Sequence, residues 1–223
     1  MNPNRDILVD AVIFDMDGTL VDSTALVETT WGEFAAHHGL DVDLAELLAY
    51  AHGRRAADTV THFLPGGRSP EEALAWMLAR ESEIRGGVQE IPGAAAFVDS
   101  FDPADVALVT SAPHDLATAR MAEAGIRVPA VVIGADDVSV GKPSPEGYLA
   151  AASRLGREPA RVAIFEDADA GIRAATASGA RVVVVGDLEG PAAAGLPRIP
   201  DYTAARVERL PEGSPEGRYR ITL

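Results

Sequence analysis

The sequence of 223 residues contains no cysteine. This absence excludes disulfide bonds, thiolate metal sites and cysteine nucleophiles. No uninterrupted apolar run approaches the roughly 18 residues that a membrane-spanning helix requires, so we expect no membrane segment. Residues 1–6 also lack the basic start and apolar stretch of a secretory signal. We therefore expect a cytoplasmic protein.

Basic residues are scarce as well. The 19 Lys and Arg against 34 Asp and Glu give a formal net charge of −15 at pH 7. A field of this sign repels nucleic acid and anionic membrane surfaces, so we expect neither as a partner. It also repels a phosphorylated metabolite, so a phosphate site needs a metal ion, a lysine or backbone N–H groups to reverse the field locally. The sequence does not fix the oligomeric state, and a monomer is favoured.

Alternation of strands and helices is the main structural pattern. Five short apolar runs predict buried parallel strands: Val9–Phe14, Val106–Val109, Val131–Ile133, Val162–Phe165 and Val182–Val185. Helical patterns separate most of them: His114–Ala124, with Leu116, Ala119 and Met121 as its apolar face, Pro145–Leu155 and Ala170–Ser178. This order predicts a doubly wound, Rossmann-like parallel α/β sheet.

One segment breaks the alternation. Residues 23–91 contain helical patterns without a convincing strand, including Thr24–His38 and a helix start at Ser69-Pro70-Glu71-Glu72. We expect an inserted helical cap domain over residues 23–91, in which Trp31 and Trp76 serve packing, and a catalytic core of residues 1–22 and 92–223. Residues 186–200 are predicted to form a loop. Within the less readable segment 201–223, residues 218–223 alternate like an edge strand.

The first candidate site follows the first strand. Asp15 and Asp17 stand two residues apart before Gly18, where one carboxylate can act as nucleophile or metal ligand and the other can handle protons. Alone, this pattern also fits a turn, a calcium loop or a sugar-nucleotide metal site. An EF-hand is excluded, because Thr19 and the apolar residues after it replace the acids that such a loop requires.

Further polar residues follow the other strands, at the sheet edge where such folds bind ligands. Thr110 and Ser111 follow the second strand and can hold phosphate oxygens, although Ser111 can equally cap the next helix. Lys142 lies between a glycine and a proline, which suits a fixed charge better than a solvated one, and it can neutralise a carboxylate and a phosphoryl group together.

A second acidic group ends the fourth strand. Asp167 is the best Mg²⁺ ligand there, because it directly follows the strand end at Glu166, and oxygen ligands suit this ion. We expect Glu166 to orient Lys142 or a metal-bound water. Asp169 is interpreted as the cap of the following helix.

These four groups match, in order and spacing, the four motifs of the haloacid dehalogenase-like superfamily, which the chain resembles over essentially its whole length. The resemblance implies that Asp15 forms an aspartyl phosphate and that Asp17, absent in the dehalogenases, acts as general acid and base. It also implies that Mg²⁺ is held by Asp15, Asp167 and the backbone carbonyl of Asp17. Thr110, Ser111 and Lys142 would hold the phosphoryl oxygens.

The cap sequence bears on the substrate. Gly53, Arg54 and Arg55 follow His52 in a pattern similar to the cap loop of glycerol-3-phosphatases and 2-deoxyglucose-6-phosphate phosphatases. The resemblance favours Arg55 over Arg54 for substrate recognition, while two solvated arginines that open a helix are the simpler alternative. The partner expected is a small phosphorylated metabolite.

The preferred function is therefore a Mg²⁺-dependent phosphatase acting on a small sugar or polyol phosphate. A phosphomutase of the β-phosphoglucomutase type shares the motifs, although Thr19 stands where such mutases usually have valine. A phosphoglycolate phosphatase is a third possibility. A binding protein that has lost the chemistry is disfavoured, because Asp15, Asp17, Lys142 and Asp167 are all present.

Overall fold

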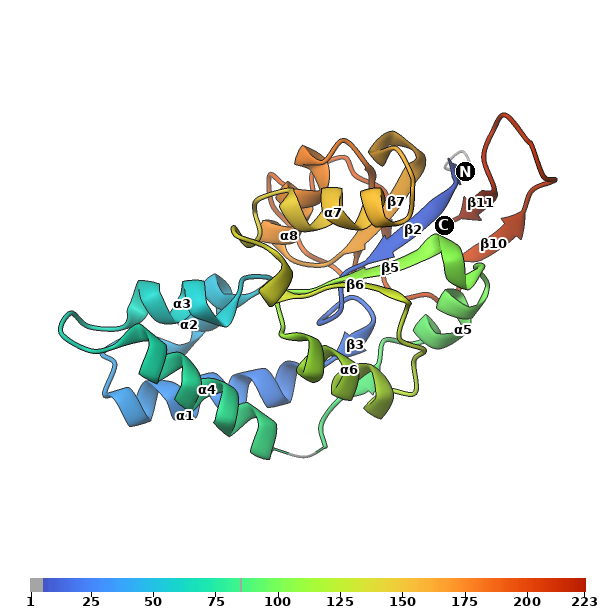
Figure 1. Ribbon diagram of the computed structural model, residues 1–223. Helices are drawn as coiled ribbons and strands as arrows, with labels where there is room; N and C mark the ends of the chain where they lie inside the picture. Colours follow the sequence, from blue (N-terminus) through green and yellow to red (C-terminus); the bar gives the residue numbers. More distant parts are fainter. Residues whose placement is uncertain (1–5, 85) are drawn as a thin grey trace.

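A six-stranded parallel sheet forms the centre of the protein (Figure 1). The computed structural model describes residues 6–84 and 86–223. The strand order is β6-β5-β2-β7-β8-β9, with β2 (Ala11–Phe14), β5 (Val106–Val109), β6 (Val131–Ile133), β7 (Val162–Glu166), β8 (Arg181–Val185) and β9 (Arg198–Ile199). All five predicted runs supply strands of this sheet.

Helices cover both faces of the sheet, as predicted. Along β2, Val12 and Phe14 join the hydrophobic cluster of α5 (Ala94–Asp99) and α6 (His114–Glu123). The alternate residues Ala11 and Ile13 join the cluster of α7 (Glu146–Arg154) and α8 (Asp169–Ala177). Because side chains alternate along a strand, one apolar run is buried by both layers. Within the described residues, three short 3₁₀ turns connect elements, at Pro103–Asp105, Ala135–Asp137 and Pro159–Arg161.

The apolar face predicted for α6 is wrong in one position. Ala119 is exposed, whereas Ala117, Arg120 and Met121 are buried. Alanine has so little side chain to bury that its position carries a weak signal. The buried face therefore includes an arginine.

A smaller antiparallel sheet joins the two ends of the chain. β1 (Ile7–Val9) and β10 (Arg206–Arg209) pair with opposite sides of β11 (Tyr219–Thr222). The C-terminal strand is thus central and not an edge, and the predicted run from Val9 is divided at Asp10 between two sheets. The predicted loop 186–200 also contains β9. All three differences depend on which distant segments of the chain pair with one another, and the local sequence pattern does not reveal such pairing.

In the described part of the chain between β3 (Val21–Asp22) and β4 (Gln89–Glu90) there are four helices. They are α1 (Thr24–His38), α2 (Leu44–Ala51), α3 (Ala56–Phe63) and α4 (Pro70–Glu83), called here the helical segment. Trp31 and Phe34 belong to its own hydrophobic cluster, and the partly buried Trp76 packs against it. In Figure 1 the segment lies beyond the carboxyl ends of the sheet strands. Of the described helices, none has the length and apolar character needed to cross a membrane.

Local hydrogen bonds fix where α4 begins and where the helical segment joins the core. The Ser69 hydroxyl accepts a hydrogen bond from the Glu72 backbone N–H at 3.2 Å, so α4 begins where its sequence predicts. The two chain connections are held side by side, because β3 and β4 pair antiparallel. β4 is a two-residue strand in a region for which no strand was predicted.

Candidate active site

The turn after β2 carries the first acidic motif. Gly18 has a φ of 82°, and a Cβ there would lie 2.0 Å from Asp167 Oδ2. Only glycine therefore allows this turn to approach the loop after β7 so closely. The next residue, Thr19, donates a hydrogen bond to Asp167 Oδ1 at 2.8 Å.

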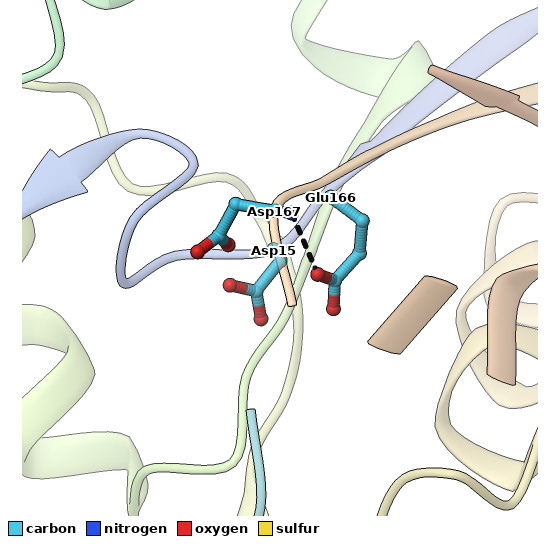
Figure 2. A group of neighbouring side chains, drawn as sticks. All are labelled: Asp15, Glu166 and Asp167. Carbon is cyan, nitrogen blue, oxygen red and sulfur yellow. Dashed lines mark hydrogen bonds between the residues drawn. The ribbon is translucent and has the colours of Figure 1, made fainter. Parts of the chain in front are cut away.

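Four of the predicted residues form one buried group, called here the catalytic cluster: Asp15, Lys142, Glu166 and Asp167. Single carboxylate oxygens of the three acids all lie within 4.8 Å of one another (Figure 2). Lys142 Nζ donates to Asp15 and, at 2.7 Å, to Glu166. The structure thus joins the ends of β2 and β7 to the loop after β6.

Four hydrogen bonds hold the Glu166 carboxylate within the cluster. Its Oε1 accepts from Lys142 and from the Tyr148 hydroxyl at 2.9 Å. Its Oε2 accepts from the backbone N–H groups of Asp167 and Ala168, at 2.8 and 2.9 Å. Both oxygens are engaged by the protein, so Glu166 is held in place and in turn orients Lys142. Asp15 and Asp167 are then the carboxylates better suited to a metal ion.

The charge of the cluster is unbalanced. Three carboxylates face one ammonium, and burial raises the pKa of Asp15 well above its ordinary value, with Glu166 and Asp167 adding to the rise. Burial also raises the pKa of Asp167. Burial favours the neutral form of Lys142, yet Asp15 and Glu166 raise its pKa well above the ordinary value. An oxygen-only site with excess negative charge fits a divalent metal ion.

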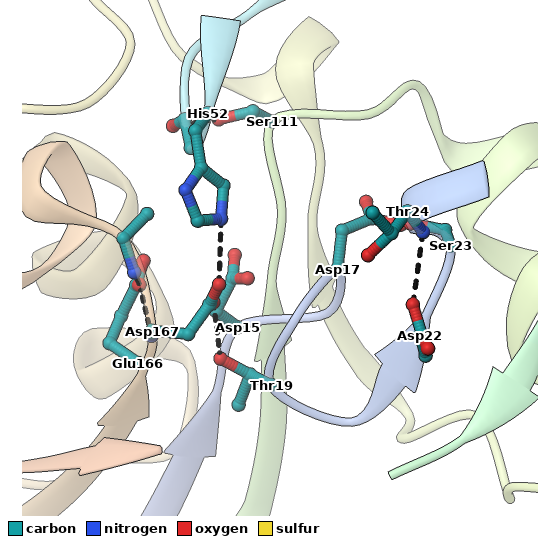
Figure 3. A network of polar contacts seen from close by, with 12 residues as sticks. Asp15, Asp17, Thr19, Asp22, Ser23, Thr24, His52, Ser111, Glu166 and Asp167 are labelled. Atoms are coloured by element: carbon teal, nitrogen blue, oxygen red, sulfur yellow. Dashed lines mark hydrogen bonds and ion pairs between the residues drawn. The ribbon is translucent and has the colours of Figure 1, made fainter. Parts of the chain in front are cut away.

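Asp17 lies apart from the cluster (Figure 3). Its Oδ1 accepts hydrogen bonds from the Ser23 hydroxyl at 2.6 Å and from Arg120 Nη1 at 2.7 Å. The Asp17 side chain faces a large pocket, which also exposes part of Asp15 and Asp167. The two acids of the motif therefore have different surroundings: the Asp15 carboxylate lies within the cluster, and the Asp17 carboxylate lies against Ser23 and Arg120.

Thr110 and Ser111 also line this pocket. The Thr110 hydroxyl accepts from the backbone N–H of Ala112 at 3.1 Å. The Ser111 hydroxyl donates to the carbonyl of Gly53 at 2.9 Å, and the residue that directly precedes α6, in the cap position, is Pro113. Helix capping, the alternative for Ser111, is therefore wrong, because its side chain contacts the helical segment instead.

Asp169 is also not a helix cap. Ala168 precedes α8, and Asp169 is its first residue. The Asp169 carboxylate pairs with Arg173 one turn later, at 2.7 Å. An i,i+4 ion pair on the helix surface explains this acid without a role in the site.

The loop after α2 reaches the cluster. His52 Nε2 lies 2.7 Å from Asp167 Oδ2 (Figure 3), and this hydrogen bond raises the pKa of His52. Gly53 has a φ of 74°, and a Cβ there would lie 2.6 Å from the Ala168 Cβ. Glycine at position 53 therefore lets this loop rest directly on the loop after β7.

The two arginines that follow have different surroundings. The Arg54 guanidinium lies over the Tyr50 ring, 4.8 Å from its centroid, and lines the large pocket. Arg55 pairs with both oxygens of Asp58 at 2.9 Å and donates to the Val138 carbonyl at 3.1 Å. These positions favour Arg54 over Arg55 for substrate contact, the reverse of the prediction.

The pocket has a volume of about 440 Å³ and lies between the helical segment and the carboxyl ends of the strands. Asp15, Asp17 and Asp167 lie on the core side. The opposite side is mainly hydrophobic and is called here the apolar wall: Val27, Trp31, Leu48, Met77 and Leu78. Trp31 thus lines the pocket besides packing inside the helical segment.

Comparison with known proteins establishes the family. The haloacid dehalogenase-like hydrolase family model matches residues 9–179, and the chain belongs to this family. Hexitol phosphatase A of Escherichia coli K12 is 38% identical over 180 residues, which cover 78% of this chain and 81% of that protein. Glycerol-1-phosphate phosphohydrolase 2 of Saccharomyces cerevisiae is 32% identical, over 78% of this chain and 74% of that protein.

A solved structure shares the fold. The crystal structure of a family hydrolase from Deinococcus radiodurans R1, with bound phosphate and sodium, superposes with a TM-score of 0.60 at 28% identity. The match covers 85% of this chain and 90% of that one. The predicted family and the predicted fold are both confirmed.

Several residues of the site were not predicted from the sequence, among them His52, Glu81 and Arg120. His52 belongs to the loop motif but had no role assigned. Glu81 extends the buried stripe of α4 that contains Ala73 and Met77, at positions four residues apart. A charged residue on such a stripe could have indicated a buried ion pair, because charged side chains are rarely buried without a partner.

Proposed function

We propose that the protein is a Mg²⁺-dependent phosphatase that hydrolyses a small sugar or polyol phosphate through an aspartyl-phosphate intermediate. The observation that carries this proposal is the buried catalytic cluster, with Asp15 at the floor of a pocket and Lys142 bonded to it. Phosphatases of such substrates are among the relatives with 31–38% identity.

Each residue has a role in this chemistry. Asp15 attacks phosphorus, so that a P–O bond forms to its carboxylate and the bond to the substrate oxygen breaks. Asp17 gives its proton to the departing oxygen and then takes one from the water that hydrolyses the phosphoenzyme. Lys142, with Thr110 and the backbone N–H of Ser111, offsets the negative charge on the phosphoryl oxygens.

Asp15, Asp167 and the backbone carbonyl of Asp17 would hold the metal ion. When bound, Mg²⁺ supplies positive charge that stabilises the phosphoryl group during transfer. Its two charges would offset the excess of carboxylates over ammonium groups in the cluster. His52 Nε2 contacts Asp167 Oδ2 at 2.7 Å, so a metal ion bound through this oxygen would compete with that contact.

The helical segment supports a role in substrate selection. We propose that residues 23–91 act as a cap over the core of residues 1–22 and 92–223. Arg54 and the apolar wall are placed to contact the part of the substrate that does not react. A phosphomutase fits less well, because it needs a second phosphate site in the cap. Arg55, one of its two candidates, is already bonded to both oxygens of Asp58.

The test is phosphate release from a panel of polyol, hexose, deoxyhexose and glycolate phosphates, together with β-glucose-1-phosphate. Each compound is assayed with Mg²⁺ and with EDTA, using Asp15→Asn as the inactive control. We expect metal-dependent release concentrated on polyol or hexose phosphates. Conversion of β-glucose-1-phosphate to glucose-6-phosphate with little free phosphate would overturn the proposal in favour of a mutase. Inactivity on every compound would favour a binding protein.

A further inference from the structure

Arg120 is a buried cation that the proposed mechanism leaves unused. It lies in α6, on the core side of the pocket, and its side chain is 5% exposed. One arm of its guanidinium, Nη1, donates to Asp17 at 2.7 Å. The other arm, Nη2, donates to Glu81 in the helical segment. A single guanidinium thus joins the motif acid of the core to a carboxylate of the segment above it.

The surroundings of Arg120 indicate more than a structural ion pair. Glu81 is buried too, and burial raises its pKa despite the arginine. Arg120 Nε is buried without a hydrogen-bond partner among the described residues. Such an arrangement costs stability, because charges and donors leave water without full compensation. A hydrophobic side chain on this face of α6 would satisfy packing alone.

The geometry of Asp17 shows what the arginine does. Ser23 and Arg120 both donate to Asp17 Oδ1, and together they hold the carboxylate toward the pocket instead of toward Asp15 and Asp167. In an in-line displacement, the departing oxygen lies on the far side of phosphorus from the attacking carboxylate. The pocket side is therefore where an acid is needed.

We propose that Arg120 is a positioning residue, which aims Asp17 at the leaving oxygen of the substrate and ties that aim to the helical segment through Glu81. This inference rests on the proposed phosphatase function. In this role Arg120 itself does not contact the reacting atoms. Glu81 fixes the second arm of the guanidinium, so a displacement of α4 shifts the support of Asp17.

Leaving-group dependence tests the proposal. Protonation matters for a sugar or polyol alkoxide, which leaves poorly, and hardly for p-nitrophenolate. Phosphoenzyme formation is followed in a single turnover with glycerol phosphate, or the best alkyl phosphate of the panel, and with p-nitrophenyl phosphate. We expect Arg120→Met to slow the alkyl reaction about 100-fold and the aryl reaction by no more than about threefold.

Companion variants separate positioning from folding. Arg120→Lys keeps one donor and is expected to restore part of the alkyl rate, and Glu81→Gln to lower that rate about fivefold. The control is Arg157→Met, which removes a similar ion pair, with the buried Asp105 at 2.9 Å, before β5 and away from the pocket. It should reduce stability without any leaving-group effect.

The results distinguish failure of the positioning role from failure of the proposed phosphatase function. Equal losses on both substrates in Arg120→Met and Glu81→Gln, or no loss in either, would overturn the positioning role. Wild-type protein that forms no phosphoenzyme with any substrate would overturn the proposed function instead.

Discussion

The two sides of the pocket differ in how their residues are fixed. On the core side, every member of the catalytic cluster is hydrogen-bonded to another charged or polar group. On the opposite side, the apolar wall offers a hydrophobic surface, and Arg54 lies beside it as a cation. Under the proposed function, a hydrogen-bonded polar network carries out the reaction, whereas substrate choice depends on the fit of a hydrophobic surface and few polar groups. Substitutions on the two sides should have different consequences.

The largest effect is expected from Asp15→Asn on the core side. The amide cannot form an acyl phosphate, so kcat should fall by about 10⁴-fold or more. The side chains have nearly the same shape, so the fold should persist. The measurements are phosphate release and circular dichroism of the purified variant. Substantial residual turnover would show that another group is the nucleophile.

A second core substitution, Asp167→Asn, tests the excess negative charge of the catalytic cluster. We expect kcat to fall about 10³-fold through loss of metal binding. In EDTA the variant should gain thermal stability over wild type as pH rises. The reason is that a carboxyl with a raised pKa binds more protons when folded, so its contribution to the free energy of unfolding falls as pH increases from about 4.

Melting temperatures from pH 4 to pH 8, with and without Mg²⁺, check this result. Mg²⁺ should stabilise the wild type and leave Asp167→Asn nearly unchanged. A constant difference between the two proteins at all pH values would mean that the Asp167 charge is not the source of the imbalance.

The matched pair Arg54→Ala and Arg55→Ala examines the other side. Arg54 lines the pocket, so its loss should lower kcat/KM for the best substrate about tenfold and for p-nitrophenyl phosphate much less. Arg55 is bonded to Asp58 and to a core carbonyl, so its loss should affect both substrates alike. Steady-state kinetics on the two compounds distinguish these outcomes, and the reverse pattern would restore Arg55 as the specificity residue.

The smallest effect is expected from Ser69→Ala in the helical segment. Loss of the hydrogen bond to the Glu72 N–H should reduce the free energy of unfolding by about 1 kcal/mol. Thermal unfolding measures it, with Thr61→Ala in α3 as the control, because alanine is the better helix former and this variant should lose no stability. Turnover should not change in either variant. An altered kcat would mean that the helical segment influences the chemistry from a distance.

The sequence predicts the core side far better than the opposite one. Asp15, Lys142 and Asp167 follow strand ends, and the carboxyl ends of parallel strands necessarily meet at one sheet edge. His52 and Arg120 depend on how the helical segment lies on the core, which no local pattern describes. The same reason explains why the sequence favours Arg55 whereas the structure favours Arg54, because the pairing of Arg55 with Asp58 competes with any ligand. The sheet formed by β1, β10 and β11 was missed since it pairs the two ends of the chain.

The pairing of β3 with β4 has a consequence for how such proteins diversify. Val21 faces Glu90 and Asp22 faces Gln89, so the inserted helices begin and end at neighbouring points of the core. A segment attached in this way behaves as a cassette: its length and sequence can change without altering the path of the strands that carry the catalytic cluster. If the segment selects the substrate as proposed, exchange of this cassette between relatives would change the substrate range and leave the reacting residues in place.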